Sequence, residues 1–402
     1  MSRFRRTAIL LVVAIAAFYA GSLAEFQLGG YAPDWAKSLL FYTAPKSNID
    51  YGALNEVFTT IQQHYVKPNA NGLKLTEGAA AGMVSALGDQ FSRYLTPAEY
   101  SANQTFLNGQ FAGIGASVEQ KGDQIVIASI LPGTPAEKNG LKVGDVITAV
   151  DGQSSKGWTA DTAVNKIRGT ANTQVQIQVS RNGQTLTFNL TRQEINVPSV
   201  ATHIFDNRVL YVRIFEFGSR TGTEFDQALT NNLKGSVNMV LLDLRDNPGG
   251  YVDQANEVIS EFVSSGTTTI LVERGGKEDV RKVSGSGHAY TNSLVVLVNE
   301  NSASASEITA GAIKDHNRGK LVGVKTFGKG SVQQDFILRD GDLHLTIAEW
   351  LTPNRHSIEK TGITPDKTVT LPSAQDEYAV DQTPNDFSKD LQLTAALAML
   401  EA

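Results

Sequence analysis

The sequence predicts a multidomain α/β protein with an N-terminal helical region, an inserted β-rich domain and a C-terminal core in which strands and helices alternate. Residues 49–104 carry apolar side chains at helical spacing. Residues 105–193 change to short β segments separated by Gly-rich turns. Residues 194–372 contain the apolar runs "NMVLLDLR", "SLVVLVN" and "KLVGV", which are typical of strands in a buried sheet. A polar tail with a terminal helix, residues 373–402, completes the predicted organisation.

The helical region is expected to contain at least two helices. The first places Leu54, Phe58 and Ile61 at helical spacing. A second predicted helix begins near Thr76, a residue type that often caps helix N-termini. Pro97 is expected to end the helical portion, because proline lacks the N–H that a helix interior requires.

The β-rich domain contains a hairpin signal, and the tail contains a helical one. "QVQIQVS" and "TLTFNLT" alternate strictly between apolar and polar residues, and residues 181–183 join them, which predicts a β-hairpin. "TADTAVNKIR" predicts a helix within the same domain. In the tail, Leu391, Ala395 and Met399 recur every four residues and predict a helix with one apolar face.

The first residues, 1–25, have the pattern of an export signal. Arginines at three positions between 3 and 6 precede the uncharged run 7–24. That run is also about as long as the shortest membrane-spanning helix, so a cleaved signal and a retained anchor both fit. Either interpretation predicts a protein of the periplasm or cell envelope. Residues 26–48 are rich in Gly and Pro with little periodicity, and predict a linker.

The composition narrows the classes of function. The 402-residue chain has a formal net charge of −6 and no basic stripe, which argues against nucleic acid as the main partner. It contains no cysteine, so disulfides, thiolate zinc sites and a cysteine nucleophile are excluded. The HExxH motif is also absent, which argues against a zinc hydrolase. We therefore expect neither a metal nor another cofactor.

The stretch "GVKTFGKGS", residues 323–331, nearly matches a phosphate-binding loop. That loop needs Ser or Thr at position 330 to hold magnesium, but the residue there is glycine and the hydroxyl follows as Ser331. The next residues predict two β strands that turn at Asp340 and Gly341, whereas a phosphate-binding loop opens a helix. The sequence therefore argues against nucleotide binding.

A lysine in this stretch is a candidate general base. Lysine accepts a proton only when it is neutral, so burial would have to lower its pKa from about 10.4 toward 7. The glycines on either side of Lys329 allow the backbone to pack closely around it. Lys325, four residues earlier, is an alternative base.

Ser304 is a candidate nucleophile, because it lies in "NENSASASEITAG" between a predicted buried strand and a predicted helix. Ser304 and Glu307 also form the SxxE pattern of a capping box, a purely structural role. The same position favours an oxyanion, because N–H groups and the helix dipole point to it. None of the six histidines lies in a recognisable triad motif. Ser357 and Lys360 match SxxK, but the accompanying KTG motif begins at the same Lys360 instead of on another element.

Five motifs, in the correct order, resemble those of the carboxyl-terminal processing peptidases, also called tail-specific proteases. The motifs are "FAGIGASV" with "PGTPAEKNGLKVGDVITAVDGQ", "LLDLRDNPGGYV", "NENSASASEITAGAIKD", "GVKTFGKGSVQ" and "LTIAEWLTPNRHSIEKTGITPD". The resemblance extends over residues 49–372. It implies that Ser304 is the nucleophile, Lys329 the general base and Gln333 the residue that orients the lysine amine, and it does not require Lys325. Strand alternation would put Gln333 on the same side as Lys329.

The resemblance also implies the other parts of an active site. The N–H of Ala305 and that of Gly249 or Gly250 would form the oxyanion hole. "DNPGG" also fits a simple turn that ends a strand, and one turn can serve both purposes. "LGDQFSRYL" departs from the family by having Gln90 in place of proline. We expect this departure to affect a local turn of the helical region and not the chemistry.

The β-rich domain resembles a circularly permuted PDZ domain. Gly113, Ile114, Gly115 and Ala116 would form the loop whose N–H groups bind a C-terminal carboxylate, while the peptide adds as a strand. Arg168 ends the predicted PDZ helix, where a cation also compensates the helix dipole. We expect Arg168 to couple peptide capture to the protease core as well.

The expected function is that of an exported serine endopeptidase that binds apolar C-terminal tails of protein substrates through its PDZ domain and cleaves them with a Ser/Lys dyad. The alternatives are a catalytically silent PDZ adaptor and a resting protease that needs activation, for example by an adaptor. A histidine-dependent PDZ protease is disfavoured because no GNSGG-like segment is present. Segments 49–70 and 385–402 would suit dimerisation or packing on the chain's own core.

Overall fold

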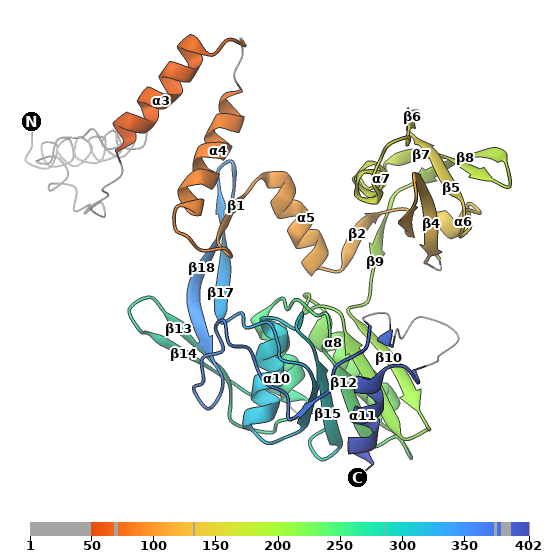
Figure 1. Cartoon of the computed structure of the whole chain (residues 1–402), viewed down its shortest axis with the longest axis vertical. Helices are drawn as coiled ribbons and strands as arrows, with labels where there is room; N and C mark the ends of the chain where they lie inside the picture. The colour runs from red at the N-terminus through yellow and green to blue at the C-terminus, as the bar shows by residue number, and fades with distance from the viewer. Residues whose placement is uncertain are drawn as a thin grey trace, which may run out of the picture. The chain divides into compact units, whose positions relative to one another are not determined.

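The computed structural model describes most of the chain from residue 50 onward (Figure 1). The described residues are 50–67, 71–131, 133–285, 287–373, 376–378 and 387–401. The predicted export signal and linker lie outside them. The chain divides into two units, 1–79 and 80–402, and each is described by itself. Among the described residues, no helix is both long enough and apolar enough to cross a membrane.

The first described helices are α3 (Tyr51–His64) and α4 (Gly72–Ser85). Asn71 caps α4, because its side chain accepts two N–H groups of the first turn at 3.0 and 3.3 Å. Thr76 lies inside the helix and donates its hydroxyl to the carbonyl of Gly72 (2.9 Å), so the predicted cap at Thr76 is wrong. Asparagine is at least as good an N-cap as threonine, and it comes one turn earlier.

Pro97 begins a helix, so the prediction that it ends the helical portion is wrong. The short strand β1 (Arg93–Leu95) comes first, and α5 (Pro97–Leu107) follows. Thr96, directly before the proline, donates its N–H and its hydroxyl to the Glu99 carboxylate at 2.8 and 2.7 Å. Proline is tolerated at the first helical position because the N–H that it lacks would have no helical partner there.

The β-rich domain is a six-stranded antiparallel sheet with the order β3-β4-β5-β7-β8, in which β6 also pairs with β5. Its elements are β3 (Ala116–Lys121), β4 (Gln124–Ile130), α6 (Pro135–Lys138), β5 (Val146–Val150), β6 (Gln153–Ser154), α7 (Ala160–Ile167), β7 (Gln174–Arg181) and β8 (Gln184–Thr191). The predicted hairpin is β7–β8, and Asn182 and Gly183 close it at φ 51° and 79°, as a two-residue hairpin turn requires. A ribbon of β2 (Gln110–Gly113) and β9 (Gln193–Asn196) lies where the chain enters and leaves this domain.

The C-terminal core is built on a six-stranded sheet with the order β10-β11-β12-β15-β16-β19. Strand β10 is antiparallel to β11, and the later neighbours are parallel. The strands are β10 (Val200–Phe205), β11 (Val209–Ile214), β12 (Met239–Asp243), β15 (Ser293–Val298), β16 (Lys320–Gly323) and β19 (Lys367–Thr368). The helices are α8 (Thr221–Asn232), α9 (Val252–Ser260), α10 (Ala305–Asp315) and α11 (Leu391–Leu400). Strands β12, β15 and β16 are the three apolar runs, which confirms the predicted α/β core.

Side chains of this sheet alternate between two apolar cores on its opposite faces. Leu210 and Leu242 belong to the core that includes side chains of α8, α9 and α10. Val209 and Leu241, one position away on the same strands, belong to the core that includes α11. The strand period of two therefore divides a wholly apolar strand between two layers of helices.

The buried face of α11 agrees only in part with the predicted stripe: Ala395 and Met399 pack partly buried against the core. Leu393, Ala396 and Leu400 are buried, whereas Leu391, where the predicted stripe begins, is 45 % exposed. Asp390, the N-cap residue, is itself buried and accepts the N–H of Leu393 at 2.8 Å. This buried cap sets the rotation of the helix, which the spacing of apolar residues alone does not reveal.

A second sheet carries the predicted two-stranded hairpin. Strands β17 (Ser331–Leu338) and β18 (Gly341–Leu351) pair antiparallel, and Leu338 lies opposite Gly341, so residues 339 and 340 form the turn. Strand β18 also pairs with β1 and with β13 (Thr267–Glu273), which in turn pairs with β14 (Glu278–Lys282).

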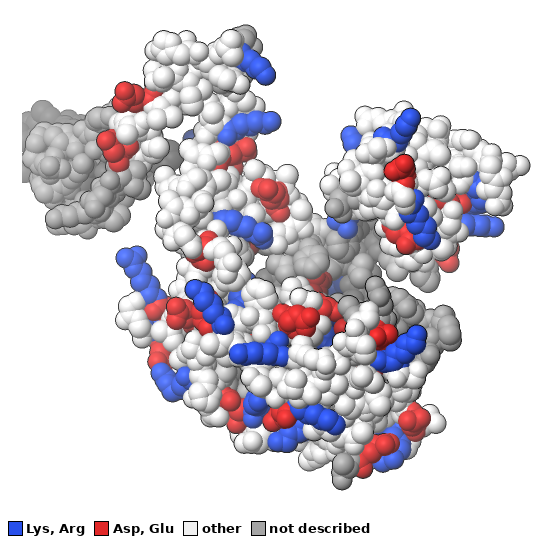
Figure 2. All heavy atoms as spheres, in the orientation of Figure 1, with Lys and Arg blue, Asp and Glu red and all other residues white. Residues whose placement is uncertain are grey.

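On the face drawn in Figure 2, Lys and Arg side chains of the described residues are interspersed with Asp and Glu.

Candidate active site

Ser304 lies in the turn between β15 and α10, at φ 55° and ψ −114°. Residues other than glycine rarely adopt a positive φ, and such strain recurs at active sites. Ser302 fixes the turn, because its hydroxyl donates to the carbonyl of Leu244 (2.7 Å) and accepts the N–H of Asn299 (2.9 Å). A strained serine between a buried strand and a helix is the arrangement that exposes the nucleophile of α/β-hydrolases.

Glu307 joins the serine turn to the lysine turn. Its side chain is fully buried, and it accepts the N–H of Ser304 at 3.0 Å, which is one half of the predicted capping box. The same carboxylate accepts the Thr326 hydroxyl (2.6 Å) and the N–H groups of Gly328 (2.7 Å) and Lys329 (2.9 Å). One side chain therefore fixes the positions of both segments.

The backbone around Lys329 is closely packed, as the flanking glycines predict. A Cβ on Gly328, whose φ is 91°, would lie 2.8 Å from the nitrogen of Gly362. A Cβ on Gly330 would lie 2.9 Å from the Glu359 side chain, whose carboxylate accepts the Gly330 N–H. Any side chain at either position would therefore displace the lysine turn.

Burial lowers the pKa of the Lys329 amine, and the positive charge of Arg93 lowers it further. Asp89, Glu307 and Glu359 oppose this effect. The Nζ atom lies over the ring of Phe91, 4.7 Å from its centroid. Within the described part of the chain, no hydrogen bond joins Lys329 to Ser304.

Ser304 and Lys329 line the same cavity, which has a volume of about 630 Å³. Gly249, Gly250 and Gln333 also line it, so the cavity brings together candidate residues from three segments that are distant in the sequence. Residues of α5 and of the β17–β18 hairpin form much of the remaining wall, among them Tyr100, Asn103, Gln104, Leu107, Gln334, Asp335 and His344. A volume of this size lies within the usual range of ligand-binding pockets, about 300–1,000 Å³.

Gln333 lies in the cavity wall, but its amide is directed elsewhere. Its nitrogen donates to the hydroxyls of Ser331 (2.9 Å) and Thr346 (3.0 Å). Lys329 precedes the first residue of β17, Ser331, so the strand alternation that the prediction used does not extend to the lysine. The pairing of β17 with β18 is irregular between Val332 and Gln333, but it skips Ile347, so the extra residue of this bulge lies on β18.

The two candidate oxyanion glycines differ in their hydrogen bonds. The N–H of Gly249 donates to the side chain of Asn247 at 2.9 Å. The N–H of Gly250 has no hydrogen-bond acceptor among the described residues. A Cβ on Gly249 would lie 2.7 Å from the Ser304 Cβ and 2.9 Å from the Ala305 nitrogen, so only glycine fits beside the serine.

A buried ionic network supports the loop that carries these glycines. The Arg245 side chain donates to Asp243 (2.6 Å) and to Asp390 (2.8 Å), and all three side chains are fully buried. Tyr211 donates its hydroxyl to the same Asp243 carboxylate at 2.7 Å. The sequence analysis did not predict this network. Asp243 and Arg245 stand at the end of an apolar strand, and this pair could have indicated a buried ionic contact, because buried charges require partners.

The β-rich domain contains a second cavity, of about 330 Å³. Its wall includes the four residues of the predicted carboxylate loop and Arg168: Gly113, Ile114, Gly115, Ala116 and Arg168. Apolar side chains such as Val164 and Ile167 of α7 complete it. Arg168 is the C-cap residue of α7, as predicted, and its N–H donates to the Val164 carbonyl at 2.8 Å.

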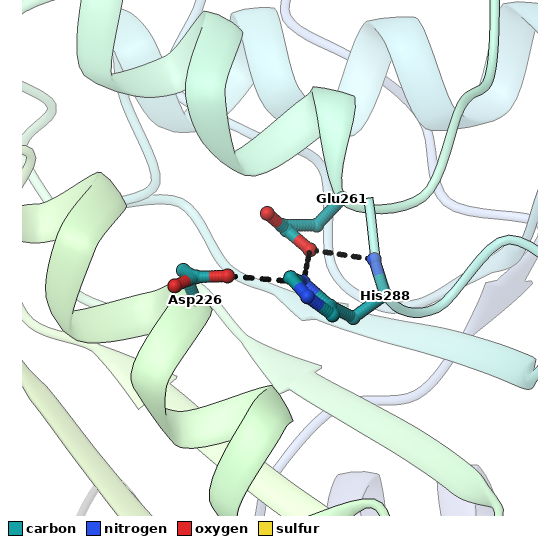
Figure 3. Close-up of side chains that lie close together, drawn as sticks. All are labelled: Asp226, Glu261 and His288. Carbon is teal, nitrogen blue, oxygen red and sulfur yellow. Dashed lines mark hydrogen bonds and ion pairs between the residues drawn. The ribbon is translucent and has the colours of Figure 1, made fainter. Parts of the chain in front are cut away.

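Asp226, Glu261 and His288 form a cluster of the kind that can hold a metal ion (Figure 3). His288 Nδ1 lies 3.0 Å from a carboxylate oxygen of Asp226 and 3.0 Å from one of Glu261. The side chains of Asp226 and His288 are 44 % and 46 % exposed. Contacts between an imidazole and neighbouring carboxylates are common on protein surfaces, so this arrangement does not by itself indicate a metal site.

Comparisons with known proteins give consistent matches. The model of peptidase family S41 matches residues 208–369, and the PDZ domain model matches residues 104–180. A CtpA-like serine protease of Staphylococcus aureus is 37 % identical over 333 residues, which cover 82 % of this chain and 67 % of the relative. One of Staphylococcus saprophyticus is 34 % identical over 375 residues, which cover 92 % and 75 %.

Solved structures show the same similarity. The photosystem II D1 C-terminal processing protease is 30 % identical, with a TM-score of 0.50, over 85 % of this chain and 90 % of that one. An S41 protease of Bacteroides fragilis is 17 % identical, with a TM-score of 0.53, over 89 % and 99 % of the two chains. The second match bears on the fold alone.

Proposed function

Because the chain belongs to peptidase family S41 and is a C-terminal processing serine protease with a PDZ domain, we propose that Ser304 and Lys329 form its catalytic dyad. The observation that carries this proposal is the shared cavity, which holds a strained serine at a helix N-terminus and a lysine whose pKa is lowered by burial. Lys325, the alternative base, is exposed and does not line that cavity.

The reaction is acyl transfer through a serine ester. Neutral Lys329 takes the proton of the Ser304 hydroxyl while Oγ attacks the carbonyl carbon of the scissile bond. The resulting ammonium group gives that proton to the leaving amine, and the acyl-enzyme forms. Lys329, neutral again, then takes a proton from the water that attacks the ester carbon. As the ester bond breaks, the ammonium group returns this proton to Ser304 Oγ, and the second product leaves as a carboxylic acid. The lysine side chain is long enough to approach Ser304 when substrate is bound.

The oxyanion of each tetrahedral intermediate would accept the N–H groups of Ala305 and Gly250. The hydrogen bond between Gly249 and Asn247 favours Gly250 as the second donor. Gly249 then contributes by lacking a side chain, which leaves the space beside Ser304 open. One such donor is worth about 3 kcal/mol of transition-state stabilisation.

The PDZ domain would select the substrate. The loop of residues 113–116 would bind the terminal carboxylate, and the apolar cavity beneath it would accept an apolar last side chain. Arg168 lies at the end of α7, in the wall of that cavity. It would couple peptide binding in the cavity to the activity of the protease core. Export is proposed from the N-terminal pattern of residues 1–25, so the substrates would be loosely folded proteins of the cell envelope.

Cleavage assays of matched variants test the dyad. With β-casein or a peptide that has an apolar C-terminus as substrate, we expect Ser304→Ala and Lys329→Ala each to reduce turnover by at least about a thousandfold. Lys325→Ala, a change of the same type four residues away, should cleave like the wild type. Undiminished cleavage by either dyad variant would refute the proposal. Tail binding without cleavage by the wild type would favour an adaptor or a resting enzyme.

A further inference from the structure

The Lys329 amine rests on an aromatic ring that no predicted role includes. Its Nζ atom lies 4.7 Å from the centroid of the Phe91 ring. An ammonium group over a ring face at this distance is attracted by the ring quadrupole. Phe91 belongs to "LGDQFSRYL" and directly follows Gln90, so this stretch contributes a side chain that lies against the candidate base.

The turn that carries Phe91 is fixed by hydrogen bonds. The Asp89 carboxylate accepts the Phe91 N–H (3.0 Å), the Ser92 hydroxyl (2.6 Å) and the Thr346 hydroxyl (2.5 Å). The Ser92 hydroxyl in turn accepts the Thr346 N–H at 2.9 Å. The backbone that carries the ring is therefore joined to β18 through Asp89, Ser92 and Thr346.

The same hydrogen bonds reach the predicted orienting residue. Gln333 donates its amide to the Thr346 hydroxyl at 3.0 Å, and that hydroxyl donates to Asp89. Gln333 is thus connected to Lys329 through Thr346, Asp89 and the Phe91 ring, although its amide does not bind the amine. A change in any of these groups would change where the ring lies.

We propose that Phe91 is a positioning residue for Lys329, and that its ring holds the ammonium form of the lysine away from Ser304. Neutral lysine lacks this attraction, so loss of the proton frees the amine to approach the serine. The inference rests on the proposed role of Lys329 as the base. The inference adds a defined position for the protonated lysine side chain, against the Phe91 ring.

The other charged groups around the amine also act on the pKa of Lys329. Arg93 of β1 repels the ammonium form, whereas Asp89, Glu307 and Glu359 attract it. The Phe91 ring adds to the attraction but also excludes water. Replacing it by leucine keeps an apolar group and removes the ring quadrupole, so the pKa of Lys329 should fall further.

The titration of Lys329 can be measured without any catalysis. Lysine labelled with ¹³C at Cε would be introduced into the full chain carrying Ser304→Ala, and the Lys329 signal would be assigned by its loss in Lys329→Arg. We expect Phe91→Leu to lower its pKa by about 0.5 to 1, a three- to tenfold change in proton affinity. Phe91→Tyr keeps the ring and should titrate like the parent. Phe336→Leu, the same change on β17 away from the lysine, is the matched control.

A second substitution keeps the test valid if leucine disturbs the turn. Pentafluorophenylalanine at position 91 preserves the ring shape and reverses its quadrupole, so it should lower the pKa at least as far as leucine does. In the active enzyme, the midpoint of the acid limb of the kcat/KM pH profile should shift to lower pH in the same variants. An unchanged or raised pKa in both folded variants would overturn the inference. Because Ser304→Ala and Lys329→Ala are tested separately, failure of the dyad would be recognised independently.

Discussion

Glu307 illustrates how much one side chain can contribute to an active site without contacting substrate. From the sequence it was expected only as the partner of Ser304 in a capping box. In the structure its buried carboxylate accepts four hydrogen bonds from two turns, including the N–H groups of both Ser304 and Lys329. The distance between nucleophile and base therefore depends on this carboxylate.

Glu307→Gln should weaken both the fold and the catalysis. An amide has one oxygen acceptor, so its NH2 group would face two of the four donors, and we expect the free energy of unfolding to fall by about 3 kcal/mol. Urea unfolding monitored by tryptophan fluorescence measures this change, and kcat should fall in the same variant. Glu300→Gln, an exposed position of the same segment, is the control. Equal stability of the two variants would contradict the role assigned to Glu307.

The C-terminal helix supports the oxyanion loop at the scale of an element. Asp390 caps α11 and also pairs with Arg245, which precedes the glycine-rich turn by only a few residues. Gln392 adds a hydrogen bond to the same guanidinium group at 3.1 Å. The tail of the chain is therefore joined to the protease core by buried polar contacts as well as by its apolar face.

Asp390→Ala should be strongly destabilising, because it leaves part of the Arg245 charge buried without a partner. Breaking a buried pair of this kind costs about 3–5 kcal/mol. Glu401→Ala, on the same segment, breaks only the exposed pair with Arg208 and should cost less than about 1 kcal/mol. Calorimetric melting of the two variants compares them directly, and similar melting temperatures would show that the network does not hold the helix.

Over the whole molecule, the proposal requires that tail binding at the PDZ domain change the rate of cleavage. Arg168→Ala should reduce the stimulation of turnover by a tail peptide by about fivefold or more. The measured quantity is the ratio of turnover with and without the peptide. Lys166→Ala, an exposed cation on the same helix, is the control. If Arg168→Ala leaves this ratio unchanged, Arg168 does not couple the two domains.

The sequence was informative wherever a local pattern determines the structure. Apolar runs gave the strands of the core, and the turn at Asn182 and Gly183 gave a hairpin, because both depend on neighbouring residues. Local patterns failed at Pro97 and at the exposed Leu391 of α11, where capping or distant contacts determine the structure. Contacts such as that of Asp390 with Arg245 join residues far apart in the sequence and leave no local signal. The roles assigned to Ser304 and Lys329 remain predictions, because they rest on motif resemblance and proximity.

The most direct measurement of the central claim is the site of covalent modification by a fluorophosphonate, mapped by mass spectrometry of the intact and digested protein. The account predicts a single adduct on Ser304 in the wild type and in Lys325→Ala. The adduct should form with a rate that increases as pH rises through the lowered pKa of Lys329, and it should be lost in Lys329→Ala. An adduct on another residue, or equally fast labelling of Ser304 without Lys329, would contradict the account.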